Sequence, residues 1–200
     1  MNGFEIFPFA GFLVLIFLIS GRILFLKRNG ISVTTGTRNT SKTNVILYPI
    51  FLLVLLLFLF ETIKPAFQIS FSILPETFIN PLVDSLIMKI AGILFIVFAL
   101  VFLWLALLHF KNSLRFGLDE KNKGELITTG IFSISRNPFF LSIDLYFWGI
   151  SFVLPNLFFI GFAVLAQVSI HFFILKEEKF MVKIYGRKYL EYLQNVGRYF

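Results

Sequence analysis

Residues 139–175 of the chain read FFLSIDLYFWGISFVLPNLFFIGFAVLAQVSIHFFIL, an apolar run with one interruption at Pro155-Asn156. Because Pro cannot continue a helix and Asn tolerates turn geometry, this pair predicts a tight turn. The two arms, about Phe139 to Leu154 and about Leu157 to Leu175, then form an antiparallel helical hairpin. Periodicity does not assign structure within such uniformly apolar runs, so length and helix breakers decide the interpretation.

Three further apolar runs precede this hairpin, at about Ile6 to Leu26, Val45 to Ile63 and Leu86 to Leu108. A membrane-spanning helix needs roughly 20 apolar residues, because each residue rises about 1.5 Å across a hydrocarbon layer of about 30 Å. The sequence therefore predicts an all-α polytopic membrane protein with five transmembrane helices. We expect one integral membrane domain over residues 1–200, with a three-span part (1–109) and a C-terminal part (110–200).

The composition supports this class and excludes others. Of the 200 residues, 58% are hydrophobic, only 14% are charged and 29 are phenylalanine. Soluble domains carry about 25% charged residues, so a disordered chain or a soluble nucleic-acid-binding domain is excluded. The chain has no cysteine, which excludes disulfides and a thiolate nucleophile.

The net charge of +7 is a topology signal, because Lys and Arg next to spans stay on the cytoplasmic side. Sixteen of the 18 basic residues follow the first, third or fifth span: Arg22, Lys27, Arg28, Arg38, Lys42, Lys111, Arg115, Lys121, Lys123, Arg136, Lys176, Lys179, Lys183, Arg187, Lys188 and Arg198. This pattern predicts an outside N-terminus and a cytoplasmic C-terminus. The compact chain and the lack of a retention signal favour a bacterial inner membrane over the endoplasmic reticulum.

Two segments are predicted to lie at the membrane surface. The apolar but proline-broken segment from Lys64 to Ser85 suits the outer interface. The tail from Lys176 to Phe200 has the apolar spacing of an amphipathic helix with Tyr and Lys nearby, which suits the headgroup level on the inner side. Gly186 weakens this interfacial helix midway and predicts two shorter pieces.

Polar groups converge at the cytoplasmic end of the hairpin. If the turn lies between Pro155 and Asn156, Arg136 is level with Leu175, and the doublet Glu177-Glu178 is level with Ile134 and Ser133. Adjacent helical residues project about 100° apart, so the two carboxylates serve different partners. One can pair with Arg136 while the other faces a pocket; alternatively, both are solvated carboxylates at a helix end.

The same depth rule pairs Asp144 with Gln167 inside the bilayer. An ionisable residue within a span suggests a functional site, although Asp144 can equally hydrogen-bond Gln167 or Tyr146 as a bundle contact. His109 and His171 lie near the cytoplasmic ends of their spans. Without a third convergent ligand they do not predict a metal site.

At these residues the sequence resembles the isoprenylcysteine carboxyl methyltransferase family, which is related to the membrane phospholipid N-methyltransferases. The resemblance covers about residues 110–200. It rests on Leu126-Ile127-Thr128-Thr129-Gly130-Ile131-Phe132, on Arg136-Asn137-Pro138-Phe139-Phe140, on Glu177-Glu178-Lys179-Phe180-Met181, and on Gly186 with Tyr189 and Tyr192. In their order and placement around one hairpin, these stretches are similar to the family pattern.

The resemblance implies a methyltransferase that uses S-adenosylmethionine at the cytoplasmic interface and a membrane-soluble acceptor, with carboxyl O-methylation as the expected reaction. Neither nucleic acid nor a metal is an expected partner, because no basic face is interleaved with exposed aromatic residues and no third convergent metal ligand is evident. Cofactor contacts are expected at Glu125, Leu126, Ile127, Phe132, Asn137, Pro138, Phe139, Phe140, Glu177 and Glu178, with Arg136 and Asn137 as the catalytic pair. Acceptor contacts are expected at Asp144, Gln167, His171 and Phe173.

The sequence departs from the family pattern at three places. Asn137 replaces a frequent His, so a role that needs an ionisable imidazole is lost. Phe132 and Phe140 replace Tyr and keep the packing without the hydroxyl groups. Phe173 replaces an Arg that faces the substrate, so a prenylcysteine carboxylate loses its cation.

Two other functions remain open from the sequence. The first is an NADPH-dependent membrane reductase on a related bundle, which requires more basic residues for the phosphates of its cofactor. The second is a membrane scaffold or lipid-binding protein without catalysis. Binding of S-adenosylhomocysteine or NADPH distinguishes the three.

Overall fold

The computed structural model describes residues 3–31, 42–111 and 125–200, and within these every regular element is a helix. The long helices are α1 (Ile6–Arg28), α2 (Lys42–Phe67), α4 (Leu86–His109), α5 (Pro138–Val153) and α6 (Leu157–Tyr185). The short helices are η1 (Gly3–Glu5), α3 (Glu76–Ile79), η2 (Gly130–Ser133) and α7 (Arg187–Asn195). The all-α prediction is thus confirmed for the described residues. Four basic residues used for the predicted orientation lie outside them: Arg38, Arg115, Lys121 and Lys123.

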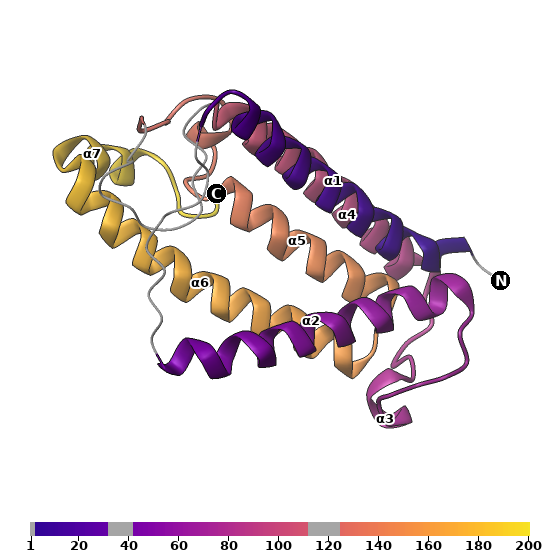
Figure 1. Ribbon diagram of the computed structural model, residues 1–200. Coiled ribbons are helices and arrows are strands. Elements are labelled where there is room, and N and C mark those ends of the chain that lie inside the picture. Colours follow the sequence, from indigo (N-terminus) through magenta and orange to yellow (C-terminus); the bar gives the residue numbers. More distant parts are fainter. Residues whose placement is uncertain (1–2, 32–41, 112–124) are drawn as a thin grey trace.

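The long helices form an elongated bundle with two distinct ends (Figure 1). Helices α1 and α4 run side by side, and α5 lies between α4 and α6. We refer to the end that holds α7 and the start of α5 as the α7 end. The opposite end, which holds the turn at Pro155-Asn156, is the tip end. The C-terminus lies near the start of α5, although α6 and α7 separate the two in sequence.

The predicted hairpin turn is present. Helix α5 ends at Val153, and Asn156 caps α6 by accepting a hydrogen bond from the backbone N–H of Phe159 at 2.9 Å. At the α7 end, Pro138 begins α5, where an N–H group would have no partner within the helix. Pro138 and the Pro155-Asn156 pair, the helix breakers in this stretch of sequence, therefore set the two ends of α5.

Two glycines bring α4 and α5 into close contact. A Cβ atom at Gly92 would lie only 2.7 Å from the carbonyl oxygen of Gly149. Such small residues allow two helix backbones to approach closely within a membrane. One turn earlier in α5, the Tyr146 hydroxyl donates to the carbonyl oxygen of Pro8 in α1 at 2.6 Å. These contacts hold α5, which carries the candidate site at its start, firmly against the bundle.

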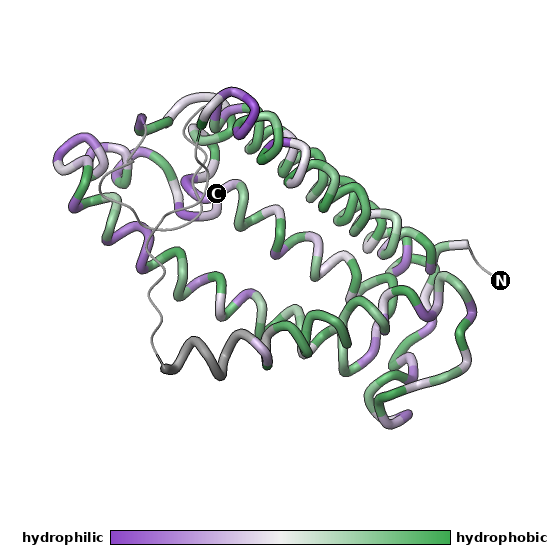
Figure 2. Tube along the Cα trace, in the orientation of Figure 1, coloured by the Kyte–Doolittle hydropathy of each residue, from purple (hydrophilic) through white to green (hydrophobic). Residues whose placement is uncertain are grey.

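The long helices consist mostly of hydrophobic residues, and hydrophilic residues gather toward the ends of the bundle (Figure 2). Phe17, Ile87 and Leu165 are 73%, 80% and 69% exposed. Large exposed apolar surfaces mark contact with a membrane or a partner. Together with the helix lengths, this surface indicates a membrane protein.

Among the described residues, three helical segments are long and apolar enough to cross a membrane: Gly3–Arg28, Leu86–His109 and Leu157–Tyr185. The first, third and fifth predicted spans are therefore confirmed by length and composition. The second predicted span lies in α2. The fourth predicted span matches α5, whose 16 residues measure about 24 Å and fall short of the roughly 20 residues that a span needs, so five transmembrane helices are not confirmed.

The helices formed by the tail, Lys176 to Phe200, have different boundaries from those predicted. Helix α6 continues without a break through Lys176 to Tyr185, because no helix breaker occurs before Gly186. Gly186 has a positive φ of 55°, a conformation that ends helices and favours glycine. The break predicted at Gly186 is confirmed, but only α7 forms a separate helix.

The segment between α2 and α4 packs on the hairpin turn. The backbone N–H of Leu82 donates to the carbonyl oxygen of Pro155 at 2.7 Å. The Asn156 side chain donates to the carbonyl oxygen of Ile79 at 3.2 Å. This segment therefore forms part of the tip end.

Candidate functional site

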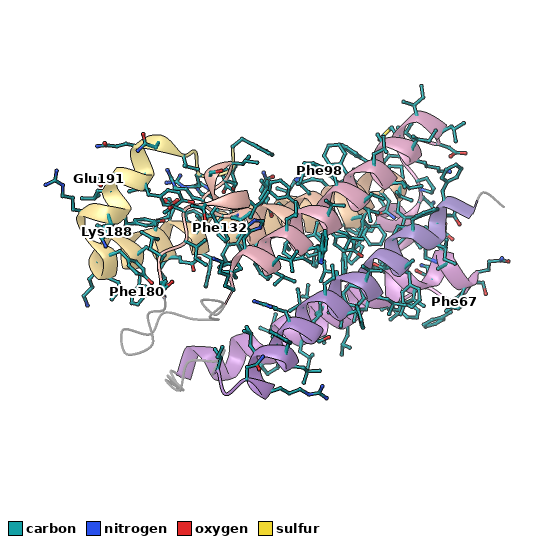
Figure 3. All side chains as sticks on the ribbon, turned by 90° about the horizontal axis from the view of Figure 1, so that it is seen from above. Phe67, Phe98, Phe132, Phe180, Lys188 and Glu191 are labelled. Atoms are coloured by element: carbon teal, nitrogen blue, oxygen red, sulfur yellow. The ribbon has the colours of Figure 1, made fainter. Side chains whose placement is uncertain are left out.

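Segments from four parts of the chain meet at the α7 end: the residues before α5, the end of α6, α7 and the last residues of the chain. The backbone N–H of Arg136 donates to the carbonyl oxygen of Gly197 at 3.1 Å. The side-chain amide of Asn137 donates to the carbonyl oxygen of Arg198 at 3.2 Å. Figure 3 shows Phe132 toward the end where Lys188 and Glu191 lie, with Phe67 at the opposite end.

The centre of this region is the Glu178 carboxylate, which is 7% exposed. Its Oε1 accepts hydrogen bonds from Nε and Nη2 of Arg136, at 3.1 and 3.0 Å, and from the Asn137 amide at 3.3 Å. Its Oε2 accepts from Nε and Nη2 of Arg198, at 3.0 and 2.8 Å. A buried carboxylate with both oxygens bonded to charged donors is well compensated for its loss of hydration.

The guanidinium group of Arg136 also binds the end of α7. Its Nη1 donates to the carbonyl oxygens of Leu193 and Val196, at 3.0 and 2.6 Å. The last carbonyl groups of a helix lack partners within the helix and attract cations. Arg136 therefore connects α5, α6 and α7, and its described hydrogen bonds all go to the protein itself.

The predicted approach of Arg136 to the glutamate doublet is present, and its partner lies about one helical turn farther from the hairpin turn than the residue level with Arg136 under the depth rule. Arg136 was expected level with Leu175 and instead bonds Glu178, three residues further along α6. The second partner of this carboxylate, Arg198, was not foreseen. No spacing in the sequence indicates it, because Arg198 reaches the site only when the chain turns back after α7.

The Arg198 side chain in the tail stays positively charged, and the hydroxyl groups of Tyr189 and Tyr192 in α7 stay neutral. The pKa of Arg198 is raised by its hydrogen bonds to Glu178, so its guanidinium group stays charged. Burial raises the pKa values of Tyr189 and Tyr192. The neutral Tyr192 hydroxyl donates to the carbonyl oxygen of Phe132 at 2.5 Å. This bond joins α7 to η2.

Glu177 contrasts with its neighbour. Its side chain is half-buried, and its Oε2 atom is buried without a hydrogen-bond partner in the described part of the protein. A buried acceptor without a partner costs about 1–3 kcal/mol. Because successive residues of a helix diverge by about 100°, Glu177 cannot share the partners of Glu178. Glu177 is therefore the member of the doublet that can accept a hydrogen bond from a ligand.

The segment before α5 and the first turn of α5 are mostly apolar and shielded from solvent. Phe132 and Pro138 are buried, Leu126, Ile127, Phe139 and Phe140 are half-buried, and Glu125 is exposed. Gly130 has a φ of 67°, and a Cβ atom there would lie 2.1 Å from the His109 ring. This close approach orders the turn that leads into η2. Phe132 and Phe110 form an edge-on ring contact at 4.9 Å.

The expected partners of Asp144 are engaged elsewhere, which corrects the predicted pairing. Gln167 accepts a hydrogen bond from the Trp148 ring at 3.2 Å, because the two helices meet about one turn away from the predicted register. The Tyr146 hydroxyl donates to Pro8. Asp144 is 5% exposed, and its Oδ1 has no hydrogen-bond partner among the described residues.

The remaining predicted acceptor residues lie on α6. His171 forms a hydrogen bond through Nδ1 with the Tyr199 hydroxyl at 2.7 Å, a contact with the tail that was not foreseen. Phe173 is 44% exposed, and its ring lies 5.3 Å from that of Phe140. Within residues 3–31, 42–111 and 125–200, no group of three His, Asp or Glu side chains is arranged to hold a metal ion.

A family described as phospholipid methyltransferase matches residues 87–188, just over half of the chain. The match contains α4, α5, α6 and the Glu177-Glu178 doublet, and it begins earlier than the predicted boundary at residue 110. Neither the comparison with curated proteins nor that with solved structures found a match.

Proposed function

Because the chain belongs to the phospholipid methyltransferase family, we propose that it transfers a methyl group from S-adenosylmethionine to an amphipathic acceptor in the membrane. The family match supports a membrane methyltransferase that acts on lipid. The observation that carries the proposal of a cofactor site is the unpartnered, buried Oε2 of Glu177 next to the fully bonded Glu178. We propose that this site lies on the cytoplasmic side of a bacterial inner membrane, with the N-terminus outside.

Glu177 and the aromatic and apolar residues at the α7 end suit the chemistry of this cofactor. Its ammonium group and ribose hydroxyls are hydrogen-bond donors, and a carboxylate such as Glu177 accepts from either. Phe139 and Phe140 offer aromatic surface for the adenine ring and for the sulfonium, which is attracted to the face of an aromatic ring. Leu126, Ile127, Phe132 and Pro138 are buried or half-buried apolar residues that we propose line the cofactor site, with the exposed Glu125 beside them.

We propose that Arg136 and Asn137 position other groups of the site and do not take part in the chemical step, in contrast to the catalytic role expected from the sequence. The guanidinium of Arg136 already binds Glu178 and two carbonyl groups of the chain. The Asn137 amide binds Glu178 and the carbonyl oxygen of Arg198. Both residues hold α5, α6 and the tail together and so fix the direction in which Glu177 points. Glu178 acts in the same way, because its oxygens accept bonds from three side chains.

The side chains along α5 and α6 favour an amine over a carboxylate as the acceptor. Asp144 is a buried carboxylate with an unpartnered oxygen, and His171 lies one element away on α6. A carboxylate there repels an anionic acceptor and attracts an ammonium group. Phe173 and Gln167 supply apolar and polar surface at the lipid boundary. The carboxyl O-methylation implied by the family resemblance is the second candidate.

When bound, S-adenosylmethionine supplies the electrophilic methyl group. The chain has to orient the acceptor, exclude water and remove the proton of an ammonium acceptor so that its lone pair is free. Asp144 Oδ1 is the atom that accepts this proton. Orientation of two reactants contributes roughly 7–11 kcal/mol to such reactions, so positioning supplies most of the rate.

Calorimetry on the protein in detergent tests the proposal against its rivals. Titration with S-adenosylhomocysteine is expected to give saturable heat, and titration with NADPH none. Heat with NADPH alone would support a reductase, and no heat with either ligand would support a scaffold. Methyl transfer to short-chain lipids with an amine or a carboxyl headgroup then identifies the acceptor.

The role of Asp144 has its own test. We expect Asp144→Asn to lower kcat on the amine acceptor about 100-fold, because loss of a general base costs at least this factor. Affinity for S-adenosylhomocysteine should stay unchanged, since Asp144 does not belong to the cofactor site. Wild-type kcat in the variant would exclude Asp144 as the base.

A further inference from the structure

A second polar site lies at the tip end, far from Glu178. A cavity of about 530 Å³ lies between the end of α2, the segment after it, the start of α4 and the turn between α5 and α6. Its volume is within the range of roughly 300–1,000 Å³ that is typical of small-ligand sites. The charged and polar residues that line it include Glu5, Glu61, Lys64, Asp84, Lys89 and Asn156.

Glu61 is the most informative of these residues. It is 3% exposed, although it belongs to the apolar helix α2. Its Oε2 accepts a hydrogen bond from Nζ of Lys64 at 2.8 Å, whereas its Oε1 is buried without a partner in the described part of the chain. A buried carboxylate oxygen without a donor is costly, so this atom indicates a ligand that donates a hydrogen bond.

The other charges limit what that ligand can be. Three carboxylates and two ammonium groups line the cavity, so the lining is net negative and favours a cationic group. Lys64 and Lys89 are mostly buried, with side chains 13% and 12% exposed, and they pair with Glu61 and Asp84 at 2.8 and 2.6 Å. An ammonium group has three N–H donors, so both side chains bring positive charge and further donors to the same space. A ligand that matches both signs is a zwitterion.

We propose that the cavity at the tip end binds a zwitterion that carries a primary ammonium group and a phosphate, as in the headgroup of an aminophospholipid. The ammonium donates to Glu61 Oε1, and the phosphate lies near Lys64 and Lys89. The apolar lining at Ile69, Val83 and Phe159 accommodates the adjoining glycerol and acyl carbons. This site does not depend on the proposed methyl transfer, because none of its charged residues belongs to the α7 end.

Native mass spectrometry of the full chain in detergent tests this proposal. The probes are short-chain phosphatidylethanolamine, phosphatidylcholine and phosphatidylglycerol. The ethanolamine lipid is expected to form a saturable one-to-one adduct at least about tenfold tighter than the other two, because only its headgroup has N–H donors for Glu61. Equal affinities for the three lipids would overturn the proposal, whatever the outcome for methyl transfer.

Free phosphoethanolamine distinguishes the two sources of this headgroup. Binding as tight as that of the lipid would assign a soluble ligand, and weaker binding would assign the lipid; either result supports the contact with Glu61. Absence of both adducts overturns it.

Variants locate the contact. Glu61→Gln is expected to weaken binding of the ethanolamine lipid about tenfold and to abolish the preference over phosphatidylcholine. Glu76→Gln removes the same charge from an exposed position at the same end and should leave binding unchanged. An unchanged lipid preference in folded Glu61→Gln protein would contradict the proposal. If this variant does not fold, the comparison of the three lipids on the wild-type chain decides.

Discussion

The α7 end and the tip end each bury a glutamate in a long helix, but they satisfy it in different ways. Glu178 accepts hydrogen bonds on both oxygens, from Arg136, Asn137 and Arg198. Glu61 receives one hydrogen bond from Lys64, and its second oxygen has no partner in the described residues. A carboxylate that accepts hydrogen bonds from the protein on both oxygens stabilises the fold. A buried carboxylate oxygen without a donor is a candidate contact for a ligand, and in this respect Glu177 resembles Glu61.

The largest expected effect tests this distinction directly. Glu178→Ala should lower the free energy of unfolding by about 3–5 kcal/mol, because it leaves two guanidinium groups without their buried partner. Glu61→Ala should cost less, since Lys64 keeps its hydrogen bond to Ser72. Thermal melting in detergent measures both. At roughly 2–4 °C per kcal/mol, the Glu178 variant should melt about 10 °C lower.

A matched control is the exposed pair Arg187–Glu191 on α7, which is an i,i+4 pair on the surface. Glu191→Ala should change stability by less than about 1 kcal/mol, as exposed ion pairs contribute little. If Glu178→Ala is no more destabilising than Glu61→Ala or Glu191→Ala, the structural role of Glu178 is wrong.

The next effect separates the two members of the doublet. Glu177→Ala should weaken binding of S-adenosylhomocysteine about 10–100-fold, the cost of one lost charged hydrogen bond. Its melting temperature should stay near that of the wild type, because no described group depends on its Oε2 atom. Calorimetry with Lys179→Ala, an exposed neighbour, serves as the control. Unchanged affinity in Glu177→Ala would remove Glu177 from the cofactor site.

A smaller effect distinguishes the two guanidinium groups at the α7 end. Arg198→Ala should destabilise the protein by about 1–2 kcal/mol, because it removes one partner of Glu178 and leaves the other. Arg136→Ala should cost more, since this side chain is only 8% exposed and also binds the end of α7. Melting temperatures in the reverse order would show that the tail, not α5, is the main support of Glu178.

The smallest expected effect concerns one hydroxyl group. Tyr192→Phe removes the hydrogen bond to the Phe132 carbonyl and should cost about 1 kcal/mol. Tyr185→Phe, in which the hydroxyl group is lost from the end of α6, provides a comparison at a half-buried position. A melting temperature equal to that of the wild type in Tyr192→Phe would mean that packing alone joins α7 to η2.

Much of the fold could be predicted because it depends on local chemistry. Pro155-Asn156 ends one helix and caps the next, and Gly186 ends α6, whatever surrounds them. The approach of Arg136 to the glutamate doublet also follows from two helices of known rise joined by a short turn. The error of about one turn arose because the turn geometry and helix packing, which shift one helix along the other, are not encoded in local spacing.

The partners at both ends depended on contacts between distant parts of the chain. Arg198 and Tyr199 reach Glu178 and His171 only because the last residues fold back over the start of α5. The pairing of Asp144 with Gln167 was predicted from depth alone, and the register of the two packed helices brings Gln167 to Trp148 instead. No pattern in the sequence indicated a role for Glu61, since a single acidic residue near a helix end is usually solvated.

The sequence by itself determined the helices, the ends at which they stop and the class of membrane protein, because hydrophobic length and helix breakers act on neighbouring residues. Only the tertiary structure decided which carboxylates have hydrogen-bond donors for both oxygens and which do not. Hydrogen-bond partners are assigned by the rotation and register of packed helices and by the path of the tail. For Glu178, Glu177 and Glu61, the number of donors within reach separates a structural group from two candidate binding groups.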